Sequence, residues 1–124
     1  MRVKVYAFIP GFLIEGRGFY FVSENINMKI TFIIGGARSG KSSFALREAS
    51  GMNGHKLYIA TAEALDDEMR ERIAKHKSER GTDWDTIEEP MDIAGSISGS
   101  LNKYNVGLLD CLTLWLSNIM IRTQ

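Results

Sequence analysis

The segment "GGARSGKS" at positions 35–42 constrains the fold more than any other part of the chain. It fits the pattern G-x-x-x-x-G-K-[ST], whose specified positions are filled by Gly35, Gly40, Lys41 and Ser42. The apolar run "KITFII" (29–34) precedes the pattern and predicts a buried strand. The segment "KSSFALREAS" (41–50) follows with helix-forming residues, and Gly51 should end that helix. This order of strand, glycine-rich loop and helix predicts a nucleotide-binding domain.

The residue types in this loop suit phosphate binding for physical reasons. Glycines reach positive φ and let backbone N–H groups converge on phosphates, while the following helix directs its positive end toward them. Lys41 can reach the β- and γ-phosphates, and the Ser42 hydroxyl can ligate Mg²⁺. A glycine-rich turn that binds nothing is the alternative, and the flanking strand and helix favour the phosphate site. The predicted phosphate contacts are Gly35, Gly36, Ala37, Arg38, Ser39, Gly40, Lys41 and Ser42.

Strand and helix patterns alternate along the rest of the chain. Strands are predicted at 56–61, 83–89 and 106–112, and helices at about 66–80, at 91–103 and from 113 onward. Asp66 or Asp67 should cap the helix at 66–80, and Gly81 should end it. The alternation predicts an α/β fold, a P-loop NTPase with a mainly parallel sheet flanked by helices.

Composition narrows the possible partners and compartment. The 124 residues suffice for one domain, and 15 basic and 15 acidic side chains cancel, so no global field attracts nucleic acid or anionic lipid. No apolar run reaches membrane-spanning length, and a single cysteine suits a reducing cytoplasm. We therefore expect a cytoplasmic protein that binds neither nucleic acid nor membrane.

Residues 1–27 differ in character from the remainder, being rich in Phe, Gly and Asn without a clear period. Their short apolar patch lacks a small-residue cleavage site, and Pro10, Gly11 and Glu15 interrupt it, so we do not expect a signal peptide. An N-terminal hairpin is one interpretation. We favour the other, in which 28–124 form the nucleotide-binding domain and 1–27 are an extension or a start-site artefact.

A P-loop protein also needs an acidic residue at the end of a neighbouring strand to hold Mg²⁺ through water. Asp110, which closes the apolar run "VGLL", is placed for that role. Its position is equally typical of a helix N-cap ahead of Thr113, and the residues alone leave both roles open.

His76 lies in the positively charged segment "RIAKHKSERG" of the predicted helix. Leu65, Met69 and Ile73 recur every four residues as a predicted buried stripe, which His76 continues toward the helix end. Arginines one turn before and after it, Arg72 and Arg80, suit phosphate oxygens geometrically. The residues alone favour a partly buried, inert histidine over a nucleophile. The second histidine, His55, reads as a loop residue.

Taken in order, "ITFIIGGARSGKSSFA", "LYIATAEALDDEMRERIAKHKSERG", "WDTIEEP" and "LLDCLTLWLSN" resemble the bifunctional adenosylcobinamide kinase / adenosylcobinamide-phosphate guanylyltransferase family of cobalamin biosynthesis. The resemblance covers about residues 28–124. It implies a RecA-like P-loop enzyme that phosphorylates adenosylcobinamide with a nucleoside triphosphate and then transfers GMP from GTP to adenosylcobinamide phosphate. In the family that transfer passes through a guanylylated histidine, which matches His76 here.

The resemblance also implies a set of nucleotide contacts and cofactors. GTP and ATP are the expected nucleotides, with Mg²⁺ held by Ser42 and Asp110, and with Lys41 and Arg80 offsetting charge on the departing pyrophosphate. Beyond the loop, the implied nucleotide contacts are Thr61, Ala62, Glu63, Ser78, Glu79, Arg80, Gly81, Glu88 and Asp110, with Glu89 beside Glu88.

The family domain continues beyond the "LLDCLTLWLSN" helix, so we expect this chain to form an incomplete version of the sheet. A trimer is implied for a complete chain. Two other functions stay open: a different small-molecule P-loop kinase in which His76 is inert, and an inactive fragment that at most binds nucleotide.

Overall fold

The computed structural model describes residues 22–24, 29–36, 39–99 and 101–123. Its strands are β1 (Val22–Glu24), β2 (Lys29–Thr31), β3 (Lys56–Ala60), β4 (Trp84–Glu88) and β5 (Val106–Asp110). Its helices are α1 (Lys41–Ser50), α2 (Asp67–Glu79), α3 (Ile93–Ile97) and α4 (Leu112–Arg122), with a 3₁₀ turn η1 (Leu101–Lys103).

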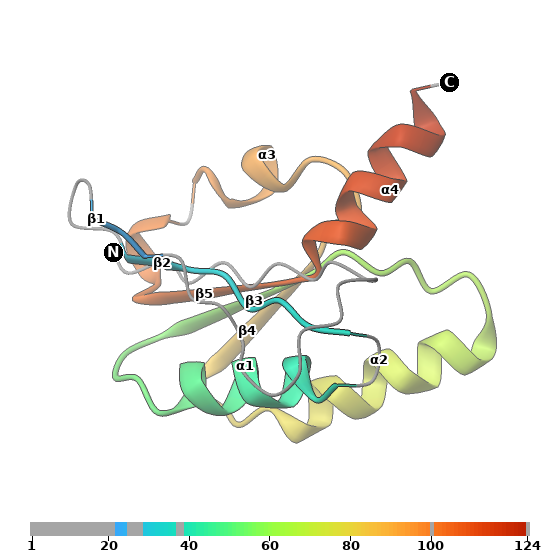
Figure 1. Ribbon diagram of the computed structural model, residues 1–124. Helices are drawn as coiled ribbons and strands as arrows, with labels where there is room; N and C mark the ends of the chain where they lie inside the picture. The colour runs from blue at the N-terminus through green and yellow to red at the C-terminus, as the bar shows by residue number, and fades with distance from the viewer. Residues whose placement is uncertain (1–21, 25–28, 37–38, 100, 124) are drawn as a thin grey trace.

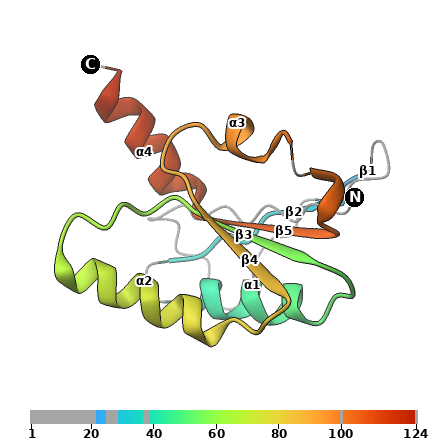
Figure 2. The ribbon, with the colours of Figure 1, turned by 180° about the vertical axis from the view of Figure 1, so that it is seen from behind.

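Strand β3 lies at the centre of a three-stranded parallel sheet, between β4 and β5. In this register Tyr58 lies opposite Thr86 on one side and Leu108 on the other. Helices α1 and α2 cover one face of the sheet, while α3 and α4 lie on the other (Figures 1 and 2). The predicted α/β fold, with a parallel sheet flanked by helices, is confirmed.

Two apolar clusters occupy the two faces of the sheet, because side chains alternate along each strand. The first joins Ala45 and Ala49 of α1 to Tyr58 of β3 and Leu108 of β5, with Ile33 from the segment before the loop. The second, on the opposite face, comprises Leu57, Ile59 and Leu109, with partly buried Ile87, Ile93, Ile97, Tyr104 and Leu112 packed against it. The first cluster therefore fixes the position of α1 against the sheet.

Most predicted elements form within one or two residues of their predicted bounds. Asp66 is the N-cap of α2, and its carboxylate accepts a hydrogen bond from the Met69 N–H at 2.7 Å. The strand predicted at 106–112 ends at Asp110, since Cys111 is already the N-cap of α4. Gly51 follows the last residue of α1 as predicted.

Two predicted elements differ from the structure. The strand predicted at 29–34 ends at Thr31 and pairs antiparallel with β1 instead of joining the parallel sheet, although Ile33 is still buried. Residues 22–24 thus form a two-stranded pairing with β2, while the rest of 1–27 lies outside the described residues and the domain boundary stays a prediction. The helix predicted at 91–103 is only α3 and η1, because glycines at 95 and 99 weaken its middle.

Candidate functional site

The glycine-rich loop meets α1 at Gly40, whose φ of 82° is a left-handed conformation that glycine adopts at little cost. No side chain among the described residues caps this end of α1. A Cβ at Gly35 would lie 2.9 Å from the Ser39 Oγ and 3.1 Å from the Lys41 stem, so these side chains would have to shift. The loop thus folds tightly around the lysine. The predicted contacts Ala37 and Arg38 lie outside the described residues.

Lys41 is buried, with 7% of its surface exposed. Its ammonium donates hydrogen bonds to the Gly36 carbonyl oxygen and, at 3.1 Å, to the Ser39 Oγ. Burial lowers the pKa of Lys41, while the neighbouring Cys111 and Asp110 oppose that shift by favouring the charged form. The Lys41 ammonium therefore lies inside the loop, at the start of α1.

Asp110 ends β5 and lies close enough to Lys41 for its charge to act on the lysine. The alternative that Asp110 caps the next helix is wrong, because the Cys111 Sγ accepts the Leu114 N–H at 3.4 Å. The Asp110 carboxylate instead accepts a hydrogen bond from the Tyr58 hydroxyl. Burial and the charge of Asp110 together raise the pKa of Tyr58 well above its usual range.

The donor set at this place suits a hard cation that binds together with a nucleotide. Mg²⁺ prefers oxygen ligands and is usually held by one or two carboxylates with substrate phosphates and water. Ser42 is exposed in the first turn of α1, and Asp110 is partly exposed at the adjacent strand end. Within the described ranges no group of three or more His, Cys, Asp or Glu side chains could hold a metal by itself. The chain's own ligands therefore fit Mg²⁺ as a partner of bound phosphates.

Thr61 ties the ends of β3 and β5 together. Its side chain is fully buried, and its hydroxyl both donates to the Cys111 carbonyl oxygen and accepts the Cys111 N–H, each at 2.9 Å. The Asn118 amide of α4 donates to the backbone oxygens of Thr61 and Pro90. The hydroxyl of Thr61, a predicted nucleotide contact, is thus already engaged in holding the strand ends.

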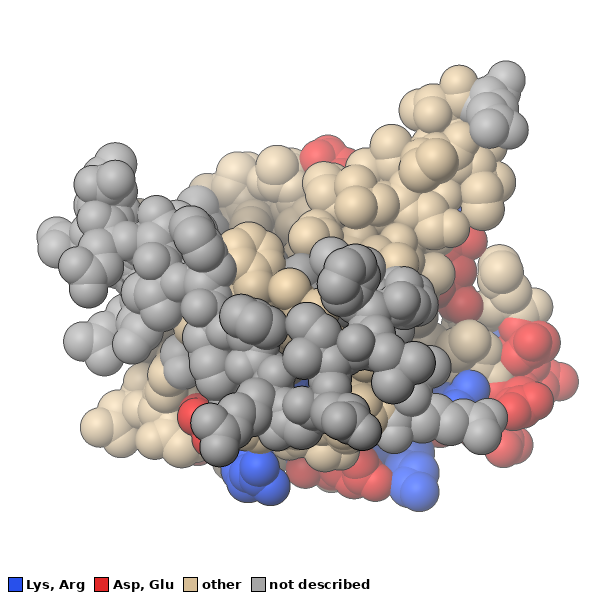
Figure 3. Space-filling model, in the orientation of Figure 1, with Lys and Arg blue, Asp and Glu red and all other residues tan. Residues whose placement is uncertain are grey.

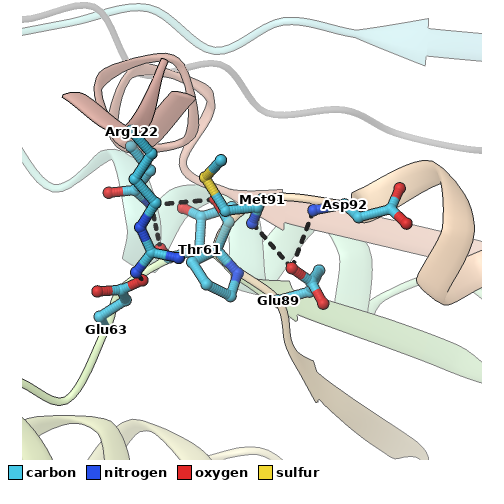
Figure 4. Close-up of polar contacts among 8 residues, drawn as sticks. Thr61, Glu63, Glu89, Met91, Asp92 and Arg122 are labelled. Atoms are coloured by element: carbon cyan, nitrogen blue, oxygen red, sulfur yellow. Dashed lines mark hydrogen bonds and ion pairs between the residues drawn. The ribbon is translucent and has the colours of Figure 1, made fainter. Parts of the chain in front are cut away.

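The loop after β3 is also tied to α4. Glu63, another predicted contact, forms an ion pair with Arg122 at the end of α4, as Figure 4 shows. Glu89 accepts the backbone N–H groups of Met91 and Asp92 at 2.8 and 2.9 Å and so orders the turn after β4 (Figure 4). Its neighbour Glu88 is exposed at the strand end.

The expectation that a buried stripe holds His76 in place is wrong. Leu65 precedes the N-cap and is 81% exposed, and none of the α2 residues is buried. The His76 side chain is itself 61% exposed, and its Nδ1 lies 3.7 Å from a carboxylate oxygen of Glu79. Figure 3 shows acidic and basic side chains along the lower edge of the molecule, where α1 and α2 lie, whereas the surface over α4 is largely uncharged.

Arg80 does not bracket His76 as the helical spacing predicted. The helix ends at Glu79, and Arg80 takes an extended conformation with φ −83° and ψ 132°. Its guanidinium is buried, with the Cζ 3.6 Å from the centre of the Tyr58 ring and Nη2 donating to the Thr86 Oγ1 at 3.3 Å. Two further predicted contacts, Ser78 and Gly81, are exposed on either side.

The structure therefore separates one group of predicted site residues, near the loop, from His76 on the exposed surface of α2. Lys41, Asp110 and Thr61 gather at the carboxyl end of the sheet, next to the loop. Among the described residues no hydrogen bond or ion pair joins His76 to that group. Tyr58, Asn118 and Arg122 were not predicted from the sequence, and only Asn118 carried a signal, as a polar residue within the apolar run "TLWLSNIMIR".

Two other features lie apart from this group. An open hollow of about 390 Å³, lined by residues 50–56 and Asp83, lies at the amino ends of β3 and β4, away from Asp110. No helix in the described part of the chain has the length and apolar character that crossing a membrane requires.

Most of the chain is similar in sequence to known proteins. Residues 31–124 match the family described as cobinamide kinase / cobinamide phosphate guanyltransferase. The chain is 46% identical over 89 residues to the bifunctional adenosylcobalamin biosynthesis protein CobP of Pseudomonas aeruginosa, covering 72% of the chain and 51% of that relative. It is 40% identical over 88 residues to CobU of Escherichia coli, covering 71% and 48%. The chain thus spans about half the length of these relatives, and it belongs to the cobinamide kinase / cobinamide phosphate guanyltransferase family.

Proposed function

We propose that this chain carries the nucleotide-binding part of a bifunctional enzyme of cobalamin biosynthesis. The enzyme phosphorylates adenosylcobinamide and then transfers GMP from GTP to the resulting phosphate. The observation that supports this most directly is the buried Lys41 ammonium inside the glycine-rich loop, beside Asp110 and at an uncapped helix start. The family match supplies the substrate class.

In the first reaction, the loop and Lys41 bind the β- and γ-phosphates of ATP or GTP. The substrate hydroxyl oxygen attacks the γ-phosphorus, the bond to the bridging oxygen breaks, and the nucleoside diphosphate leaves while the hydroxyl proton passes to solvent. Ser42 and Asp110 would hold Mg²⁺, which supplies charge neutralisation at the phosphates when bound. Lys41 offsets the negative charge that gathers on the leaving diphosphate.

In the second reaction, a neutral imidazole nitrogen of His76 attacks the α-phosphorus of GTP. The bond to the pyrophosphate oxygen breaks, so a phosphoramidate and free pyrophosphate form. The phosphate of adenosylcobinamide phosphate then attacks the same phosphorus, the P–N bond breaks, and adenosylcobinamide-GDP leaves with the histidine restored. The exposure of His76 lets a bulky corrinoid phosphate reach it.

We infer further nucleotide contacts at Ala62, at Glu88 and at the exposed residues Ser78, Glu79 and Gly81. For the assembled enzyme we propose a cytoplasmic homo-oligomer. One observation favours a second function, a small-molecule kinase in which His76 is inert: the Nδ1 of His76 already lies 3.7 Å from a carboxylate oxygen of Glu79.

Labelling with GTP distinguishes these two functions. The protein is incubated with Mg²⁺ and GTP labelled at the α-phosphate, or separately at the γ-phosphate, and protein-bound label is measured. We expect label from the α-position only, lost in acid and stable in base, as a phosphoramidate is. His76→Ala should remove it, and His55→Ala, an exposed histidine in the Gly54 turn, should retain it.

Label that persists in His76→Ala would exclude His76 as the nucleophile. Absence of α-label in the unmodified protein, together with transfer of γ-phosphate to an alcohol, would favour the kinase alone. Absence of both, with GTP still bound, would favour a nucleotide-binding fragment without activity.

A further inference from the structure

Tyr58 and Asp110 form a hydrogen-bonded pair beneath the glycine-rich loop. Tyr58 lies opposite Leu108 in the register of β3 and β5, so its side chain points to the same face as that of Asp110, two residues further along β5. The Tyr58 hydroxyl donates to the Oδ2 of Asp110. One carboxylate oxygen is therefore fixed from inside the sheet, at a residue whose charge also acts on Lys41.

The Tyr58 ring is itself held on several sides. Only 9% of Tyr58 is exposed, and the Trp84 ring meets it edge to face with centroids 6.1 Å apart. The Arg80 guanidinium lies over its face at 3.6 Å, a desolvated cation–π contact. A buried aromatic ring with this many contacts has one orientation, so its hydroxyl is a fixed donor.

Arg80 connects this pair to α2. It follows the last residue of that helix, and its Nη2 donates to Thr86 on the strand next to Tyr58. Its Nε is buried and has no hydrogen-bond partner among the described residues. The Tyr58 ring and the Thr86 hydroxyl are thus the described groups that hold this buried guanidinium.

We propose that Tyr58 is a positioning residue that orients the Asp110 carboxylate for the Mg²⁺ that accompanies the nucleotide, and that Arg80 holds Tyr58 in that role. The inference rests on the proposed function, because Asp110 matters in this way only if a nucleotide binds in the loop. Groups that orient metal-binding side chains commonly change metal affinity by about 10- to 100-fold when they are replaced.

The chain contains a matched control. The hydroxyl of Tyr104 donates to the Oδ2 of Asp85 at 2.7 Å, so a second tyrosine–aspartate pair exists. Asp85 lies near the amino end of β4, on an exposed part of the sheet, opposite Leu57. Tyr104→Phe removes the same chemical group as Tyr58→Phe without touching the loop.

The experiment measures binding of a fluorescent GTP analogue to this chain, once with saturating Mg²⁺ and once with EDTA. The dissociation constant in EDTA divided by that in Mg²⁺ isolates the metal's contribution to GTP affinity. For Tyr58→Phe we expect that ratio to fall by about tenfold, with the EDTA value within about twofold of the unmodified protein. Tyr104→Phe should leave both values unchanged. Arg80→Met, which keeps a buried stem without the charge, should lower the ratio by a smaller factor.

Each result has a separate meaning. An unchanged ratio in both Tyr58→Phe and Arg80→Met overturns the inference and leaves the proposed function standing. An equal loss in Tyr104→Phe also overturns it, because the effect would then be general. If the unmodified chain binds no GTP, the proposed function fails and the inference fails with it. If it binds GTP equally with and without Mg²⁺, the metal assignment and the inference fail while the phosphate loop stands.

Discussion

Helices α1 and α2 lie on the same face of the sheet but begin in opposite ways (Figure 1). The N-cap of α1 is Gly40, which has no side chain to cap the helix. Asp66 caps α2, and two further carboxylates follow it in the first turn. Every helix start presents N–H groups without intrahelical partners. At α2 the protein supplies its own anions for these donors, whereas no described side chain caps the start of α1, which suits the phosphate proposed to bind there.

The two helices also differ in how they are fixed to the sheet. Helix α1 buries Lys41, Ala45 and Ala49, so packing sets the position of the loop and its lysine. Helix α2 has no buried residue, and the described contact that ties its end to the sheet is the Arg80 guanidinium on Tyr58. The half of the site proposed to bind phosphate is thus packed against the core, whereas His76 lies on the surface.

The largest effect expected from this comparison follows Lys41→Ala. Removing a charged hydrogen-bond donor of this kind costs about 1.5–3 kcal/mol, or about 10- to 100-fold in affinity. We therefore expect GTP binding to weaken by that factor and both half-reactions to be abolished. Isothermal titration with GTP and Mg²⁺, together with the labelling assay, measures these losses.

Lys103→Ala is the control, because Lys103 is an exposed lysine in η1. Unchanged GTP affinity in Lys41→Ala would refute the assignment of the phosphate loop. A loss of equal size in Lys103→Ala would show that net charge, and not the position of Lys41, governs binding.

The next largest effect is expected on the free energy of unfolding, from a substitution that disturbs core packing. Ala49 has no exposed surface, so Ala49→Leu must force extra methyl groups into the first apolar cluster and should lower the free energy of unfolding by about 1–3 kcal/mol. Ala74 is exposed on α2, and Ala74→Leu should change it by no more than about 0.5 kcal/mol. Urea unfolding of both variants measures the difference. Equal losses would show that α2 is packed as tightly as α1.

The sequence was sufficient for features that depend on near neighbours. Short apolar runs predict β3 and β5, the segment at 83–89 predicts β4, and the chemistry of Asp66 predicts the start of α2 to within one residue. The pattern at 35–42 likewise predicts the loop, because the glycine and lysine requirements are local. These signals are read from a few consecutive residues.

Features that depend on distant partners could not be read in this way. Helical spacing put Arg80 beside His76, but the helix ends one residue earlier, and the extended backbone of Arg80 directs its guanidinium to Tyr58. The pairing of β2 with β1 was missed for the same reason, since a strand's partner is chosen by the whole fold. Nothing local distinguishes the tyrosine of "KLYIA" as the partner of Asp110.

The smallest effect tests the cap of α2. Asp66→Ala removes the acceptor of the Met69 N–H and should lower the free energy of unfolding by about 1 kcal/mol, which urea unfolding can measure. Asp67→Ala is the matched control, because Asp67 forms an ion pair with Arg70 whose side chains are 92% and 65% exposed, and such pairs contribute less than about 0.5 kcal/mol. GTP affinity should stay unchanged in both variants, since the start of α2 is satisfied by its own side chain. A change of GTP affinity in Asp66→Ala alone would break the comparison, because α2 would then share with α1 the task of binding the nucleotide.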